Sequence, residues 1–131
     1  MAALSDVSEK LILDWLMTTG SATRPTAWYV ALYTVAPSDS GGGTEVSGGG
    51  YARKTVAFDA AATPGGTTQN SGVVTWTAAG ASFGTVTHIG IHSASSGSGN
   101  LLWHGAMTAS KTVNDGDTLE FAAGNIDLAI A

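Results

Sequence analysis

Alternation of apolar and polar residues runs through most of the chain and predicts short β-strands from residue 27 onward. The segments are rich in Val, Ile, Thr, Tyr and Trp, and Gly, Ser or Asn residues separate them. They cover residues 27–35, 51–58, 72–78, 84–92, 100–107, 118–122 and 125–130. Between 112 and 119, Asp115-Gly116 predicts a tight reversal with positive φ angles. This regular spacing is typical of an antiparallel β-sandwich or a barrel-like domain.

Residues 4–17 have helical periodicity instead. One face of this predicted amphipathic helix is apolar and carries Leu4, Val7, Leu11, Ile12, Trp15 and Leu16. Asp6 and Glu9 approximate a capping box, and Gly20 is a natural stop. The helix either docks a partner or folds onto the protein's own sheet. We favour the second interpretation, because a single apolar stripe beside a β core is normally buried within the same domain.

Two long segments interrupt the strand pattern, a Gly-rich loop at 38–50 and a polar loop at 60–71. Loops of this length in a small domain are usually functional or poorly ordered. Because glycine makes ordering costly, we expect a partner to fix the Gly-rich loop. Tyr51 and Arg53 follow it on one side of a predicted strand and are our interface candidates. The alternative is that Tyr51 packs in the core and Arg53 is solvated.

Composition narrows the classes of partner. The 131 residues suit one domain spanning 1–131, and 44% hydrophobic residues allow a substantial core. Only 11% of the residues are charged, against roughly 25% in a typical domain. A surface with so few charges is suited to packing against neighbouring subunits. The net charge is −5 and the five cations are scattered, which argues against a nucleic-acid partner. No apolar run approaches the ~18–20 residues of a membrane span, and no signal-peptide pattern is present, so we expect cytoplasmic synthesis and no membrane partner.

Side chains capable of chemistry form no recognisable constellation. His88 and His92 lie four apart on a predicted strand, a span of about 13 Å, which is too far for one metal ion. His104 adds a third imidazole from another strand, but two or three His alone predict no metal site. The chain lacks cysteine, a Gly-x-Ser-x-Gly nucleophile elbow and a Gly-Lys-Ser/Thr phosphate loop. We therefore expect no enzyme, no metal and no cofactor.

Several segments, taken in order, make the chain resemble a family of small structural proteins of tailed bacteriophages. They are Trp28 to Pro37, Gly42 to Arg53, Gly84 to Ile91, Gly99 to Gly105, and Thr112 through Phe121 to Gly124. Members of this family are often labelled tail fibre proteins. The resemblance implies a virion protein assembled in the host cytoplasm, and it implies no catalytic residues. It also makes Glu45 and Val46 part of a recurring contact loop, alongside Tyr51 and Arg53.

The residues themselves contain neither a stalk nor a repeat from which a fibre is built. We therefore expect a homo-oligomeric decoration (cement) protein that stabilises neighbouring capsid subunits, with the major capsid protein as its partner. One alternative is a tail fibre-associated or baseplate protein, which contacts tail proteins. Another is a carbohydrate-binding module for host adsorption, which exposed Trp or Tyr in a shallow groove of the sheet would favour.

Overall fold

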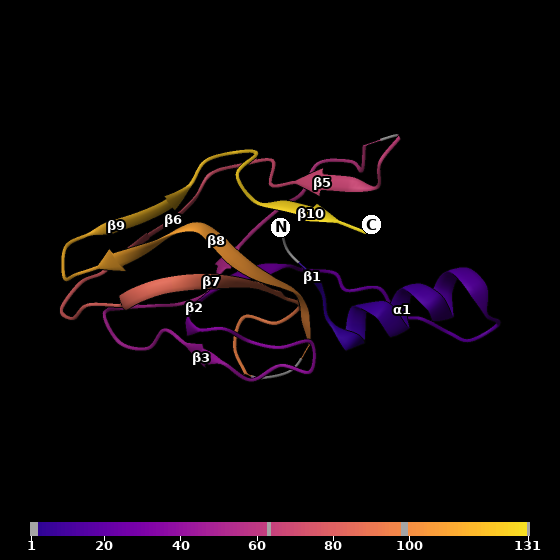
Figure 1. Cartoon of the computed structure of the whole chain (residues 1–131), viewed down its shortest axis with the longest axis horizontal. Helices are drawn as coiled ribbons and strands as arrows, with labels where there is room; N and C mark the ends of the chain where they lie inside the picture. The colour runs from indigo at the N-terminus through magenta and orange to yellow at the C-terminus, as the bar shows by residue number, and fades with distance from the viewer. Residues whose placement is uncertain (1–2, 63, 98–99, 131) are drawn as a thin grey trace.

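The computed structural model describes residues 3–62, 64–97 and 100–130. In these ranges the chain forms one α-helix near its N-terminus and ten β-strands, and each strand pairing is antiparallel (Figure 1). The elements are β1 (Ala3–Leu4), α1 (Asp6–Met17), β2 (Tyr29–Val35), β3 (Thr44–Glu45), β4 (Lys54–Thr55), β5 (Thr67–Gln69), β6 (Val74–Thr77), β7 (Gly84–His92), β8 (Leu101–Val113), β9 (Thr118–Phe121) and β10 (Asp127–Ala129). The predicted mainly β fold with an N-terminal helix is confirmed.

The strands form one large sheet and two small ones. The large sheet has the order β1-β8-β7-β2-β3, and β4 pairs with β2 as well. The pairs β6–β9 and β5–β10 form the two small sheets, which lie along the same side of β7 and β8 in Figure 1. The core cluster joins the layers, with Leu32 and Ile91 from the large sheet against Trp76 and Leu128 from the small ones. The architecture is therefore a sandwich whose second layer is split in two.

A turn at 114–117 links the layers. Asp117 N–H donates to the Asn114 carbonyl at 2.9 Å, and Gly116 has a φ of +88°. The predicted reversal is present, although Asp115 does not have the positive φ that the dipeptide suggested. The strands on either side do not form a hairpin, because β8 pairs with β7 whereas β9 pairs with β6. The turn is thus a corner that carries the chain from one sheet to the other.

Strand β8 is longer than predicted and contains a wide bulge. His88 pairs with Ala106 and Val86 pairs with Lys111, so Thr87 alone faces residues 107–110 of β8. Bulges of this kind bend a strand and interrupt its ladder of hydrogen bonds. The bulge lies where β8 passes the ends of β9 and β10, and it leaves a cleft on that side of the sandwich.

Segment 38–50 needs no partner to fix it, contrary to what its glycines suggested. Val46 N–H donates to the Leu32 carbonyl at 2.9 Å, and β3 pairs with β2. Each glycine triplet has three successive positive φ values, 73° to 103° in the first and 60° to 80° in the second. Since L-residues rarely adopt this conformation, glycine lets the chain reverse tightly here and return to the sheet. The segment is ordered by the protein's own hydrogen bonds.

Gly49→Ala tests this account of the second triplet. A Cβ at Gly49 would lie 2.6 Å from the Ala81 carbonyl oxygen, whereas a Cβ at Gly48 meets nothing within 4 Å. Both positions have positive φ, so both substitutions carry a backbone cost of about 1–2 kcal/mol. We expect Gly49→Ala to lower the free energy of unfolding by about 2 kcal/mol more than Gly48→Ala, since only the former also requires the backbone to shift. Urea unfolding of both variants measures the difference, and equal losses would contradict the packing of this turn.

Candidate interaction surfaces

Three of the four residues predicted as interface contacts, Glu45, Tyr51 and Arg53, form one internal network. The Arg53 guanidinium donates to both carboxylate oxygens of Glu45, each at 2.8 Å. It also donates to the carbonyls of Ala94 at 3.0 Å and Gly97 at 2.6 Å. The Arg53 side chain is only 3% exposed, against 28% for Glu45. Arg53 therefore ties β3 to the turn after β7, and it is not solvated as the alternative prediction held.

Tyr51 completes this network from the core side. Its hydroxyl donates to Glu45 Oε1 at 2.7 Å and accepts the Leu32 N–H at 3.0 Å, while its ring packs edge-on to Phe83. Val46, which lies between Glu45 and the second glycine triplet, is 5% exposed and belongs to the hydrophobic core. Tyr51 thus packs against the core, as one of the two sequence interpretations proposed.

The charges of the network reinforce one another. Burial alone would raise the pKa of the Glu45 carboxyl, but hydrogen bonds from Arg53 and Tyr51 and the positive charge of Arg53 outweigh it and hold that pKa below its ordinary value. The hydrogen bond to Glu45 likewise raises the pKa of the Arg53 guanidinium. Burial is the main cause that raises the pKa of the Tyr51 hydroxyl. Glu45 and Arg53 therefore stay charged and paired near neutral pH.

These contacts give the four residues a structural role within the subunit. Glu45 is the more exposed residue of the Glu45–Arg53 pair. A partner would therefore contact the network through the Glu45 side chain. A contact between this loop and a second protein stays a prediction. The sequence offered no signal that the charged pair would lie inside, because Glu45 and Arg53 are separated by a glycine turn rather than by a helical or strand period.

Helix α1 presents a different surface. Its N-terminal turn is fixed to β8, where the hydroxyl of Ser5 donates to the Leu101 carbonyl and that of Ser8 donates to the Leu102 carbonyl. Ser5, rather than Asp6, is the N-cap residue and accepts the Ser8 N–H at 3.3 Å. Beyond this turn the helix extends past the β-sheets into solvent (Figure 1). The prediction that it folds onto its own sheet is therefore wrong for most of its length.

The C-terminal half of α1 is apolar on nearly every side and exposed. The exposed fractions are 57% for Leu13, 72% for Trp15, 64% for Leu16 and 72% for Met17. A helix that is hydrophobic all round is normally buried. We call these four residues the α1 tip. Leu13 and Met17 lie outside the apolar stripe predicted from the sequence. Their presence indicates that a single sheet face could not cover all the apolar residues of this helix.

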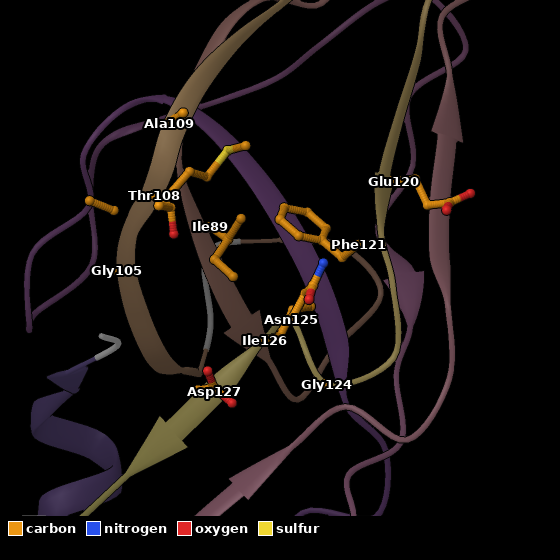
Figure 2. Close-up of a pocket in the computed structure, with 12 residues that line it drawn as sticks. Ile89, Gly105, Thr108, Ala109, Glu120, Phe121, Gly124, Asn125, Ile126 and Asp127 are labelled. Carbon is orange, nitrogen blue, oxygen red and sulfur yellow. The ribbon is translucent and has the colours of Figure 1, made fainter.

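A cleft with a volume of about 610 Å³ lies beside the β8 bulge (Figure 2). Phe121 and Ile89 extend into it, whereas the Glu120 carboxylate points away from it. Asp127 lies at the far end, so the two carboxylates do not face one another across the cleft as an acid–base pair would. The cleft therefore has partly apolar walls and no pair of carboxylates that face each other across it.

The three histidines have separate partners. Tyr33 hydroxyl lies 2.7 Å from His92 Nε2, Thr87 Oγ1 lies 2.8 Å from His88 Nδ1, and Asp39 Oδ1 lies 2.7 Å from His104 Nε2. In the described ranges, no three His, Asp or Glu side chains gather closely enough to hold a metal ion. Nor does any helix in those ranges have the length and apolar character needed to cross a membrane.

Comparison with known proteins supplies the family. No curated protein matches the chain. A family model described as podophage GP4 fiber I protein gp80 matches residues 3–129, which is nearly the whole sequence. The resemblance to structural proteins of the phage virion is thereby confirmed, and the label of fibre protein accompanies it. With α1 and every described strand inside the matched range, the chain belongs to this family of podophage fibre proteins.

Proposed function

We propose that this protein is a non-enzymatic, fibre-associated subunit of a podophage particle that attaches to another virion protein through the α1 tip. The observation that carries the proposal is the exposure of Trp15, Leu16 and Met17 together at the end of a helix that projects from the β body. Burying each such side chain is worth about 1.5–3 kcal/mol, so an uncovered tip is unfavourable in an isolated subunit. A structural subunit of an assembly has a partner to cover it.

The charges along α1 favour a particular kind of partner. The first turn of α1 contains Asp6 and Glu9, and the last turn contains no basic residue. Lys10 pairs with Asp14, which leaves the helix with a net negative charge. The last carbonyls of a helix add partial negative charge. The complementary surface is an apolar groove with a basic rim on a different virion protein, because a second copy would bring like charges together.

Substitution at the tip tests the attachment. In phage that carry Trp15→Ser together with Leu16→Gln, we expect the number of copies per particle to fall at least tenfold, since two apolar anchors worth several kcal/mol are lost. The β body should be unaffected, because both side chains are more than 60% exposed. Quantitative immunoblots of purified particles measure the copy number, and thermal unfolding of the free subunit verifies the fold.

Val73→Ser is the matched control, because Val73 is an apolar residue of the β body and is 59% exposed. It should leave the copy number unchanged. Normal incorporation of the tip variant would overturn the attachment through α1. If light scattering shows that the wild type self-associates and the tip variant is monomeric, a second copy rather than another virion protein covers the tip.

A second candidate is decoration of the capsid, which the absence of a stalk favours: the described strands all belong to one sandwich body. Cryo-electron microscopy of particles in which the subunit is labelled with antibody distinguishes the fibre-associated role from capsid decoration. Density at the tail or the neck supports the fibre-associated role, whereas density at symmetric positions over the capsid surface supports decoration.

A further inference from the structure

A small hollow lies between the large sheet and the β5–β10 pair. Its walls include three aromatic residues from separate segments: Trp28 just before β2, Phe58 after β4, and Trp103 in β8. Asp59 and Thr68 add a carboxylate and a hydroxyl. The volume of the hollow is about 270 Å³, just below the range of sites for drug-sized molecules, which suits a ligand of about one ring.

The aromatic walls present rigid carbon surface. Trp28, Phe58 and Trp103 are each partly exposed and packed against the core cluster, which holds their rings in place. The indole N–H of Trp103 is fully buried and has no hydrogen-bond partner among the described residues. What Trp103 exposes is therefore hydrocarbon. Surfaces of this kind bind the apolar face of a ligand by stacking and dispersion.

Two charged groups restrict the ligand's own charge. The Arg24 guanidinium lies over the Trp28 ring, 5.8 Å from its centroid, and so disfavours a cation beside that ring. The Asp59 carboxylate disfavours an anion. The Asp59 carboxylate accepts one long hydrogen bond, 3.4 Å from Gln69 Nε2. Because an ionised carboxylate has about four acceptor positions, it can accept further hydrogen bonds from a ligand. The hollow is thus suited to a neutral molecule that donates hydrogen bonds.

From these features we infer that the hollow binds one pyranose ring of a neutral saccharide. A pyranose has an apolar face of C–H groups that stacks on an aromatic ring, and its hydroxyls donate to carboxylates. Three aromatic rings and the Asp59 side chain thus line one hollow. None of these residues belongs to α1, so the inference stands or falls separately from the attachment through the α1 tip.

Nuclear magnetic resonance of the four indole N–H signals tests this inference on the full chain. Methyl glycosides of glucose, galactose, N-acetylglucosamine and rhamnose are titrated to about 50 mM, roughly tenfold above a dissociation constant of about 5 mM. We expect at least one glycoside to shift the signals of Trp28 and Trp103 saturably and to leave those of Trp15 and Trp76 in place. Cyclohexanol, a ring of similar size with one hydroxyl, should shift them less.

Asp59→Asn should weaken binding about tenfold, because the carboxylate accepts stronger hydrogen bonds from hydroxyls than an amide does. Glu9→Gln, which removes a charge on α1, should change nothing. Unshifted Trp28 and Trp103 signals with all four glycosides would overturn the inference. Equal shifts with cyclohexanol would also overturn it, because they would assign the hollow to apolar ligands. Shifts produced by tetramethylammonium but by no glycoside would overturn it as well.

Discussion

Arg53→Ala is expected to lower the free energy of unfolding by about 3 kcal/mol, a large part of the 5–15 kcal/mol typical of a domain. The substitution removes four hydrogen bonds, two to Glu45 and two to the carbonyls of Ala94 and Gly97. Breaking a buried ion pair on one side costs about 3–5 kcal/mol. We expect the lower end of that range, because the carboxylate left behind is 28% exposed and regains some hydration.

Urea unfolding measures the loss, and Arg24→Ala is the matched control. Arg24 is exposed, and its contact with the Trp28 ring is worth about 0.5–1 kcal/mol. Arg53→Lys separates charge from geometry, since a lysine retains the charge but not the planar fork that engages both oxygens of Glu45. It should recover part of the loss. If Arg53→Ala destabilised the protein no more than Arg24→Ala, the network would contribute nothing to folding.

Trp76→Ala is expected to have the largest effect on stability, a loss of about 4–5 kcal/mol. Trp76 is 2% exposed, and its ring meets Phe121 edge-on with centroids 6.0 Å apart. Its indole N–H donates to the Ala52 carbonyl at 2.9 Å, so that truncation leaves both a cavity and an unpaired acceptor. The residue joins the β6–β9 pair to the chain leading into β4, and its loss should loosen one half of the second layer.

Trp15→Ala is the matched control, because it makes the same change at a tryptophan that is 72% exposed, and it should alter stability by less than about 0.5 kcal/mol. Trp76→Phe serves if the alanine variant fails to fold. It keeps most of the volume and loses the donor, so we expect a cost of about 1–2 kcal/mol. Thermal unfolding followed by circular dichroism compares the three. Similar melting temperatures for the two alanine variants would refute the position of Trp76 in the core.

Strands flanked by clear turn residues could be predicted from the sequence, and those built by tertiary contacts could not. The predicted segments 27–35 and 84–92 correspond to β2 and β7, which form the buried centre of the large sheet. Segment 51–58 contains only the two-residue β4, which pairs with β2 at Tyr29 and Val30. Strands β3 and β5 fall inside segments predicted as loops. The partner of β5 is β10, about 60 residues away in sequence, whereas the two-residue β3 pairs with β2 just before the loop, at Tyr33 and Val35.

The functional residues divide in the same way. The pattern after the glycine loop singled out Tyr51 and Arg53, and one of its two interpretations placed Tyr51 in the core, but neither interpretation predicted that Arg53 is buried. Burial of Arg53 depends on the carbonyls of Ala94 and Gly97, more than 40 residues away, which no local pattern encodes. The apolar stripe of α1 was visible, whereas its exposure follows from the short anchor at Ser5 and Ser8, too small to hold the rest of the helix against β8.

The anchor of α1 also has a consequence for the order of events during synthesis. The hydroxyls of Ser5 and Ser8 bind carbonyls 96 and 94 residues further along the chain, and β1 pairs with residues 103 and 104. The helix is thus synthesised well before β8, yet it gains its fixed direction only after β8 has joined the sheet. A chain that stops short of β8 carries the same apolar residues without a defined orientation. Correct placement of the helix therefore reports that β8 has joined the sheet.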